Sequence, residues 1–334
     1  MSAKYHRSEH PSLTVLINEI LIGHCPEPLL SLDTHRQLRR ITDFIPAHKV
    51  WHFGYELSMS SVDANADFGV CVRHEDIPVL DSLIRQLPKS PSELVARSKR
   101  LFASSAIRKS EFVVPHCWLE FDFRHAPRIS LLPSMLFEIA PTDTDTLLEY
   151  ATEFIRTWYE KSRATRENAS LRKIIGKLPP QSRVFEFGIM ASRDKQPFRV
   201  AVRNVPIRAL IDLLKDIDFP QQPTERLALL NREWKPNILE ADVAFDLIAG
   251  EFSPRFGIEF KLGKTLLKNS DSQIVEYSCP AHNQLKQQCL GNFAAHLEST
   301  LTGSEYELSV YHMKFAITES TVHPKVYLSV LRRI

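Results

Sequence analysis

Two stretches of the chain resemble each other and decide the fold: WHFGYELS at residues 51–58 and FEFGIM at residues 185–190. A second apolar run follows each, at residues 68–73 and 198–203, so that Gly54 matches Gly188 and Arg73 matches Arg203. Further matches downstream extend the likeness over about residues 51–140 and 184–262. Self-similarity of this kind predicts an internal duplication.

Each copy has the pattern of a β-hairpin followed by a helix. Residues 51–58 alternate large apolar with small or polar side chains, and residues 68–73 do the same after a polar turn. The period then changes, because Ile77, Leu80 and Ile84 fall on one face of a helix. The repeating unit is therefore predicted to contain two antiparallel strands and a helix.

Five such hairpins are predicted, beginning near residues 51, 117, 183, 242 and 306, a spacing of about 65 residues. Helices are expected between them, near residues 77–87, 92–106, 144–162, 207–217, 224–234 and 283–300, and two more within residues 1–50 pack on the sheet. Two separate α+β domains would also use such hairpins, but the fifth would be left over. The expected fold is one α+β domain over residues 1–334, a ten-stranded antiparallel barrel of five α-β-β units with an outer ring of helices.

The strands also predict which face of the barrel is polar. Apolar side chains such as Phe53, Phe121 and Phe187 recur at every second position, where they face the helices. On an open sheet the other face would be solvated, whereas inside a ten-stranded barrel it lines a water-filled chamber able to hold a ligand. That second face carries His52, Glu56, Arg73, Glu120, Asp122, Glu138, Glu186, Arg199, Arg203, Asp246, Glu259, Lys261, His312, Lys314, Lys325 and Tyr327.

Composition and motifs exclude several classes of protein. The net charge of +2 is spread along the 334 residues, which is not typical of a nucleic-acid-binding protein. The apolar run at residues 13–22 is too short and too interrupted for a signal peptide or membrane span, and five cysteines without C-x-x-C spacing favour a cytoplasmic protein. No zinc spacing, P-loop or dinucleotide fingerprint occurs, so no metal site and no nucleotide cofactor is expected.

This architecture resembles the soluble aromatic prenyltransferases, the ABBA or PT-barrel family. Three short motifs carry the resemblance: Glu56-Leu57-Ser58 on the first barrel strand, Phe245-Asp246-Leu247 at the start of a hairpin, and Lys325-Val326-Tyr327 on the last strand. The resemblance implies transfer of an isoprenoid from an allylic diphosphate to an aromatic or peptide acceptor. It also implies that Glu56 accepts the acceptor's proton and that Lys325 and Tyr327 grip the diphosphate and shield the allylic cation.

Prenyl transfer needs cations for the diphosphate, aromatic faces for the carbocation and a base for the proton. Trp118 is the further aromatic candidate on the inner face. Inner carboxylates could also bring in Mg²⁺, which proteins usually hold through one or two carboxylates together with substrate phosphates. The candidate cations are Arg73, Arg199, Arg203, Lys261, Lys314 and Lys325.

The chain departs from the family where the resemblance would require further Lys, Arg and Tyr residues on the second strands. Glu138 and Glu259 stand there instead, and carboxylates would repel a diphosphate. Glu120, Asp122 and Asp246 would either raise one another's pKa for acid–base chemistry or form ion pairs with Arg73 and Arg203. The alternative function is a non-prenylating enzyme, or a barrel that binds a small molecule or peptide in an acid-rich chamber.

Glu56 matches Met190 in the second copy, so the packing of the repeat does not require a carboxylate at that position. A catalytic task explains the difference, and an exposed glutamate at the barrel rim explains it equally well. The sequence leaves the acceptor, the donor's chain length and the oligomeric state open.

Overall fold

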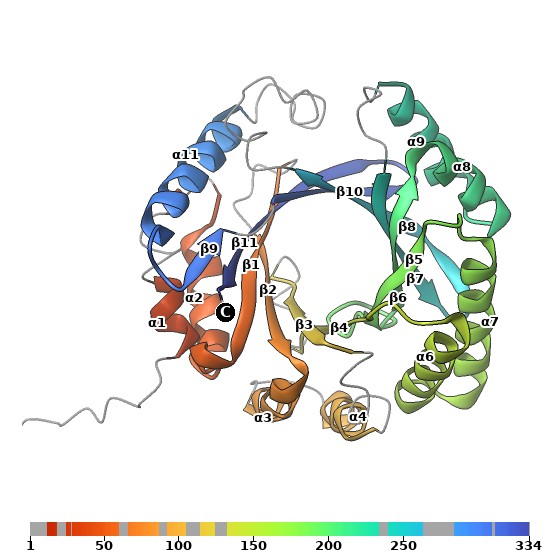
Figure 1. The fold of residues 1–334 in the computed structure, drawn as a ribbon, viewed down its shortest axis with the longest axis horizontal. Helices are drawn as coiled ribbons and strands as arrows, with labels where there is room; N and C mark the ends of the chain where they lie inside the picture. Colours follow the sequence, from red (N-terminus) through yellow and green to blue (C-terminus); the bar gives the residue numbers. More distant parts are fainter. Residues whose placement is uncertain are drawn as a thin grey trace, which may run out of the picture.

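One antiparallel sheet of eleven strands curls around on itself, because its first strand, β1, pairs with β11. The structure is a computed structural model that describes residues 12–18, 25–27, 29–59, 66–86, 92–104, 114–123, 132–233, 240–262, 284–308 and 311–333. Viewed along its axis, the sheet forms a closed ring with the helices outside it (Figure 1).

Ten strands form the barrel, each hydrogen-bonded to the next. They are β1 (Val50–Ser58), β2 (Ala66–Arg73), β3 (His116–Phe121), β4 (Ser134–Glu138), β5 (Arg183–Ile189), β6 (Phe198–Pro206), β7 (Glu240–Ile248), β8 (Glu251–Leu262), β10 (Tyr311–Thr318) and β11 (Val322–Arg332). The short β9 (Tyr306–Leu308) pairs with β11 at residues 330–332, further along than β10. The first strand of the fifth hairpin therefore consists of two pieces.

The helices cover the outside of the barrel (Figure 1). They are α1 (Leu13–Ile17), α2 (Leu32–Thr42), α3 (Ile77–Gln86), α4 (Ser92–Ala103), α6 (Thr144–Trp158), α7 (Lys161–Lys177), α8 (Ile207–Asp216), α9 (Gln221–Glu233) and α11 (Gln284–Leu301). The predicted ten-stranded antiparallel barrel with an outer ring of helices is confirmed. The alternative of two separate α+β domains is wrong, because every strand in the described residues belongs to one sheet.

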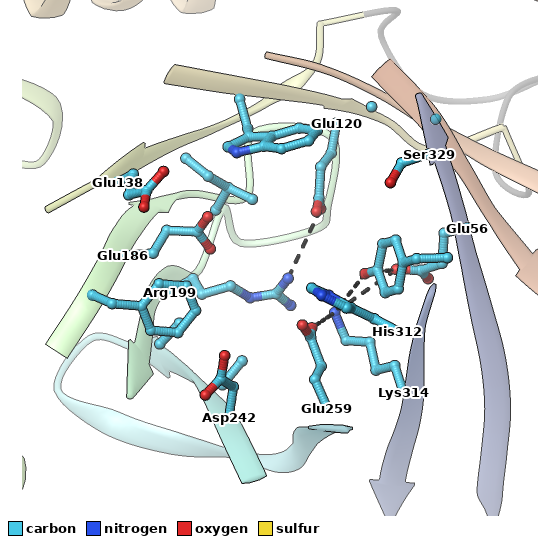
Figure 2. Close-up of a pocket in the computed structure, with 18 of the residues that line it drawn as sticks. Glu56, Glu120, Glu138, Glu186, Arg199, Asp242, Glu259, His312, Lys314 and Ser329 are labelled. Atoms are coloured by element: carbon cyan, nitrogen blue, oxygen red, sulfur yellow. Dashed lines mark hydrogen bonds and ion pairs between the residues drawn. The ribbon is translucent and has the colours of Figure 1, made fainter. Parts of the chain in front are cut away.

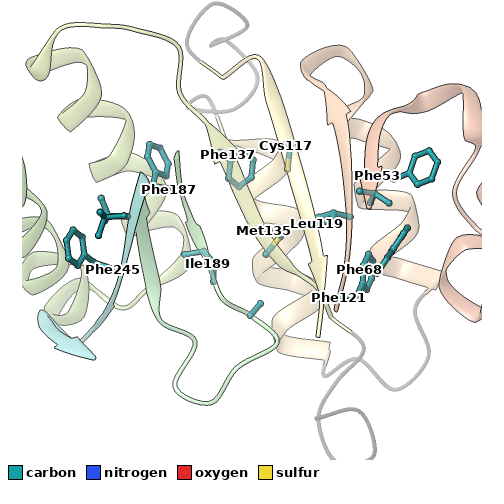
Figure 3. Packing of buried hydrophobic residues seen from close by; sticks show 14 of the residues in the cluster. Phe53, Phe68, Cys117, Leu119, Phe121, Met135, Phe137, Phe187, Ile189 and Phe245 are labelled. Atoms are coloured by element: carbon teal, nitrogen blue, oxygen red, sulfur yellow. The ribbon is translucent and has the colours of Figure 1, made fainter. Parts of the chain in front are cut away.

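The hydrophobic core lies between the outer face of the barrel and the helices (Figure 3). Phe154 of α6 packs edge-to-face against Phe137 of β4 and Phe187 of β5, with ring centroids 5.0 and 4.9 Å apart. Phe53 and Phe121, predicted to face the helices, are buried in the same core. Burial of each such aromatic side chain contributes about 2–3 kcal/mol, so the alternating apolar positions hold helices and sheet together.

By strict alternation Phe185 would share the outer face with Phe187, but it lines the inside of the barrel. The register of β5 and β6 shifts between Val184 and Glu186, and a β-bulge of this kind turns the extra residue to the other face. The matching position in β1, Trp51, lies at the same kind of register shift. Arg203 covers the ring of Phe185 at 3.9 Å and Arg73 that of Trp51 at 4.2 Å. The internal duplication stays a prediction, to which this shared local geometry lends support.

Helix α7 was not predicted, because its inward face is short of apolar residues. It buries only Ala164, Glu167, Leu171 and Ile174. Glu167 is fully buried, accepts hydrogen bonds from the backbone N–H groups of Ala249 and Gly250, and pairs with Arg163 at 3.0 Å. Glu167 on the buried face interrupts the apolar periodicity from which a helix is predicted. Its hydrogen bonds to Ala249 and Gly250 hold the β7–β8 turn in place.

Other expectations concern the N-terminal helices, the cysteines and membrane spans. Ser31 caps the N-terminus of α2 by accepting a hydrogen bond from the Thr34 N–H at 3.2 Å. Cys25, Cys71, Cys117 and Cys289 are free, and Cys279 lies outside the described residues. Within the described ranges, no helix has the length and apolar character needed to cross a membrane.

Replacing Glu167 by alanine should lower the free energy of unfolding by about 3 kcal/mol, because two backbone N–H groups and one guanidinium lose their buried partner. Urea unfolding measures the change. The exposed Glu149 on α6 provides the control, since Glu149→Ala should change stability by less than about 0.5 kcal/mol. Equal stability of the two variants would show that Glu167 does not fix the turn.

Candidate functional site

The barrel encloses a chamber of about 270 Å³ to which all ten strands contribute. Most of the residues that line it are polar or charged, as the alternation of the strands predicted. The lining residues are His52, Gly54, Glu56, Asp67, Phe68, Gly69, Trp118, Glu120, Leu136, Glu138, Phe185, Glu186, Arg199, Ala201, Arg203, Asp242, Val243, Ala244, Glu259, His312, Lys314, Tyr327 and Ser329.

Small residues create the space. Gly54 of β1 and Gly69 of β2 lie directly opposite each other, and Ala201 and Ala244 form a similar pair on β6 and β7. A Cβ atom on Gly54 would also approach the Leu328 carbonyl oxygen to 2.5 Å. The missing side chain at Gly54 therefore leaves space in the chamber and also lets β1 approach β11 closely.

Glu56 is the centre of a buried network (Figure 2). Its carboxylate accepts hydrogen bonds from the Lys325 ammonium and from the Tyr327 hydroxyl, and the Lys314 Nζ lies 3.7 Å from its Oε2. Lys314 also donates to the Tyr327 hydroxyl at 2.9 Å. One carboxylate, two ammonium groups and one phenol thus converge where β1, β10 and β11 meet.

Burial shapes the acidity of this network. Lys325 is 2% exposed, and burial lowers the pKa of its ammonium to about 7, although Glu56 and Asp67 beside it favour the charged form. Burial likewise raises the pKa of Tyr327 well above its ordinary value, with Glu259 contributing. Tyr327 is therefore a neutral hydrogen-bond donor at neutral pH.

Arg199 and Asp246 form a second buried pair. The guanidinium donates from Nε and Nη2 to the two oxygens of Asp246, at 2.8 and 3.0 Å, and Arg193 adds a bond of 2.9 Å. Burial alone would raise the pKa of Asp246, yet Arg199 and Arg193 hold it well below its ordinary value. Asp246 is an ion-pair partner, and its predicted pairing with Arg203 is wrong, since the guanidinium beside it belongs to Arg199.

The remaining cations of the chamber are also engaged. Arg203 donates to Asp242 at 3.2 Å, and Lys314 pairs with Glu259 at 2.9 Å. Burial opposes ionisation of Glu259, but Lys314 beside it lowers its pKa. Arg199 additionally lies 3.9 Å from Glu120 (Figure 2). Each Arg and Lys among the described lining residues therefore already faces at least one carboxylate.

Glu186 of β5 differs from the other carboxylates. Burial raises its pKa to about 8, and the negative charges of Glu120 and Glu259 add to the effect. Glu138 lies directly opposite it on β4, and the two side chains point into the same part of the chamber (Figure 2). Glu138 accepts a hydrogen bond from His116 at 3.1 Å, which helps to keep its pKa below the ordinary value against the effect of burial.

The structure brings most of the predicted site residues together. Glu56, Trp118, Glu120, Arg199, Arg203, Glu259, Lys314 and Tyr327 line the chamber. Lys325 and Asp246 do not line it but contact it through Glu56 and Arg199. The predicted catalytic and substrate-binding roles of all these residues stay predictions.

Three further predicted site residues are not among the lining residues either. Arg73, at the end of β2, covers Trp51 beside a separate hollow at the barrel rim. Asp122 follows the last residue of β3, where the strand alternation on which its prediction depended has ended. The side chain of Lys261 lies outside the described residues. The prediction that Arg73 belongs to the chamber is wrong. Arg73 is the last residue of β2, and this strand extends beyond the end of the chamber.

Two lining carboxylates, Asp67 and Asp242, were missed. Asp67 precedes the apolar run that begins at Phe68, and Asp242 precedes the one that begins at Val243. The sequence pattern therefore leaves both residues outside the predicted strands. Their positions directly opposite Glu56 and Glu259 become visible only when the strand register is known.

No group of three His, Cys, Asp or Glu side chains suited to a metal ion occurs among the residues that the structure describes. Glu56 and Glu259 could supply one or two carboxylates to Mg²⁺ if a diphosphate supplied the other oxygens. The Mg²⁺ requirement stays a prediction.

Comparison with solved structures identifies the fold. The 6-dimethylallyltryptophan synthase from Micromonospora olivasterospora, in complex with DMASPP and Trp, superposes with a TM-score of 0.52 at 10% identity, over 98% of this chain and 99% of that one. AnaPT from Neosartorya fischeri superposes with a TM-score of 0.54 at 15% identity, over 94% of this chain and 91% of that one. The sequence matches no protein-family model, and no curated protein is significantly similar to it.

The chain therefore has the PT-barrel (ABBA) fold of aromatic prenyltransferases over nearly its whole length. At 10–15% identity the similarity establishes the fold, and activity has to be argued from the chamber.

Glu186→Gln should become progressively more stable than the wild type as pH rises from about 4.5 to 8. A carboxyl group with a raised folded-state pKa binds more protons folded than unfolded, so its contribution to stability is present at low pH and is lost as pH rises through the folded pKa. The difference should reach a few kcal/mol, about 1.4 kcal/mol per pKa unit. Urea unfolding at pH 5, 7 and 8 measures it, with Glu149→Gln as the control. A pH-independent difference would contradict the prediction.

Proposed function

We propose that this protein is a prenyltransferase that moves an isoprenoid from an allylic diphosphate to an aromatic or other nucleophilic side chain inside the barrel. The observation that carries the proposal is the convergence of Glu56, Lys325, Tyr327 and Lys314 in a buried position of a PT barrel. These groups are a carboxylate base, two cations and an aromatic hydroxyl, which are the parts that prenyl transfer requires.

The proposed reaction breaks the allylic C–O bond, and the electron pair leaves with the diphosphate. Lys314 and Lys325 would stabilise the developing charge on the leaving group, and the Tyr327 ring would face the allylic cation. The aromatic acceptor then supplies the electron pair for the new carbon–carbon bond. Glu56 would take the proton that the acceptor loses, which restores its aromaticity.

Lys314 and Lys325 neutralise Glu56, so its carboxylate would serve as a base only after these ammonium groups are engaged elsewhere. A diphosphate carries more negative charge than a carboxylate and would compete for both ammonium groups. Release of Glu56 from Lys325 would raise the basicity of its carboxylate, because a nearby positive charge favours the ionised form. Donor binding would thereby prepare the base for the acceptor.

A second candidate is a barrel that binds or processes a small molecule without any diphosphate. It is favoured by the charges of the chamber, where the described lining has three Arg and Lys side chains and seven carboxylates, from Glu56, Asp67, Glu120, Glu138, Glu186, Asp242 and Glu259. These three, Arg199, Arg203 and Lys314, are all paired. A diphosphate has to displace carboxylates here unless Mg²⁺ accompanies it.

Glu56→Gln should lower prenyl-transfer turnover by about 10²-fold or more while the fold and donor binding persist, because the amide cannot accept a proton. Turnover is measured with dimethylallyl and geranyl diphosphate and a panel of aromatic acceptors, including tryptophan and tyrosine-containing peptides. Glu149→Gln, outside the barrel, is the matched control and should leave turnover unchanged.

Calorimetry with unreactive thiolo analogues of both donors, with and without Mg²⁺, accompanies the assay. Heat of binding in wild type and in Glu56→Gln is expected. No heat at millimolar donor under either condition would remove the prenyltransferase proposal and favour the second candidate. Unchanged turnover of Glu56→Gln would remove Glu56 from the mechanism.

A further inference from the structure

The chamber contains three pairs of carboxylates that face each other directly across neighbouring strands. They are Glu56 with Asp67 on β1 and β2, Glu138 with Glu186 on β4 and β5, and Asp242 with Glu259 on β7 and β8. Like charges in directly opposite positions destabilise a sheet, so each pair needs a compensating cation.

The protein supplies that cation for the first and third pairs. Lys325 contacts Glu56 and lies 3.6 Å from Asp67, so one ammonium serves both carboxylates. In the third pair, Arg203 donates to Asp242 at 3.2 Å and Lys314 lies 2.9 Å from Glu259. The first and third pairs are thus complete without a ligand.

The Glu138–Glu186 pair lacks an equivalent partner. Glu138 is hydrogen-bonded to His116, but the side chain of Glu186 makes no hydrogen bond or ion pair with any other described residue. Both carboxylates point into the chamber (Figure 2). The two carboxylates repel each other, and a cation from outside the chain that pairs with both would relieve this repulsion.

An aromatic surface lies next to this pair. Trp118 faces Leu136 on β4, two residues before Glu138, and both side chains line the chamber. His52 stands edge-on to Trp118 with ring centroids 4.7 Å apart, and its buried Nε2 has no hydrogen-bond partner among the described residues. Burial lowers the pKa of His52 to about 3, so the neutral imidazole nitrogen can accept a hydrogen bond.

We propose that Glu138 and Glu186 bind a positively charged nitrogen, an ammonium or guanidinium group, on the aromatic molecule held in the chamber. The aromatic part would lie against Trp118 and Leu136. A desolvated cation beside an aromatic ring gains from both the carboxylates and the ring face. The inference rests on the chamber being the acceptor site, and it names the acceptor as a cation.

This arrangement suits an organic cation better than a metal ion. The apolar faces of Trp118 and Leu136 offer no ligands, and within the described residues no third carboxylate, His or Cys completes a metal site with this pair. A chamber of about 270 Å³ fits a molecule the size of an aryl-ethylamine.

Calorimetry with matched probes tests the inference. Tryptamine and 2-phenylethylamine carry the cation, and tryptophol and 2-phenylethanol replace it by a hydroxyl of similar size. The titrations are run at about pH 8.5, where Glu186 is ionised and an alkyl ammonium with a pKa near 10.4 keeps its charge. Glu138→Gln and Glu186→Gln are compared with Glu149→Gln, and circular dichroism checks that each variant is folded.

Each amine should bind the wild type at least ~10-fold more tightly than its alcohol, the usual effect of a charge-assisted hydrogen bond. Glu186→Gln should remove most of that preference without weakening the alcohols, and Glu149→Gln should retain it. Equal affinity of amines and alcohols, or no binding of either amine at 10 mM (roughly the weakest affinity that calorimetry detects), would overturn the inference. So would a preference that survives in both folded chamber variants.

The amine-binding test of the cation site and the prenyl-transfer assay of the proposed function can fail independently of each other. Amine preference without donor binding would sustain the cation site and remove prenyl transfer. Prenyl transfer to neutral acceptors with no amine preference would sustain the transferase and overturn the cation site.

Discussion

The pairing of β1 with β11 is the interaction on which the rest of the structure depends. Seven residue pairs, from His52–Leu331 to Ser58–Lys325, join the two strands. They close the sheet and leave no exposed edge at that point. The same register places Glu56 directly opposite Tyr327. Closure of the fold and assembly of the candidate catalytic centre are therefore one event, and Gly54 permits it by letting the strands approach.

Closure also determines the electrostatics of the chamber. Side chains that would be solvated on an open sheet are confined in a small volume, where charges interact strongly and desolvation is costly. The chain responds with buried ion pairs such as Arg199–Asp246 and Lys325–Glu56. On one side, where β1, β10 and β11 meet, Lys314 lines the chamber and Lys325 lies beside Glu56. On the other side, at β3 to β5, the charged residues among the described lining are all carboxylates.

This division gives a physical reason to assign different tasks to the two sides. The lysine side suits an anionic leaving group, and the carboxylate side suits a cationic acceptor. Opposite charges on the two substrates would orient them relative to each other before reaction, and such positioning is a large part of catalysis. The neighbours in fold establish the scaffold, and these charges make the argument for substrates specific to this chain.

The sequence was sufficient to predict the barrel, because strand alternation and hairpin spacing are local signals. It also predicted Glu56, Lys314 and Tyr327 on one face, since residues two apart in a strand share a side. The partner of each charged side chain was not predictable, because it depends on the register between neighbouring strands. Asp246 forms an ion pair with Arg199, and Asp67 lies opposite Glu56 on the adjacent strand. The β-bulge at Phe185 gives no signal in the sequence, because it is defined by the register of β5 against β6. That register is known only from the structure.

The bulge also shows how a local rule fails at the site itself. Alternation assigned Phe185 to the core, yet its ring lies in the chamber beneath Arg203. The charge on the buried face of α7 concealed that helix in the same way, because Glu167 serves backbone N–H groups of a distant turn. In both places a tertiary contact overrides the local pattern.

A crystal structure with dimethylallyl S-thiolodiphosphate bound would show whether the closed barrel is the reaction chamber, with its anion site at β1, β10 and β11. We expect the diphosphate inside the barrel, contacting Lys314, Lys325 and the Tyr327 hydroxyl, with Glu56 released from Lys325. A diphosphate bound outside the barrel, or among Glu120, Glu138 and Glu186, would show that the anion site lies elsewhere.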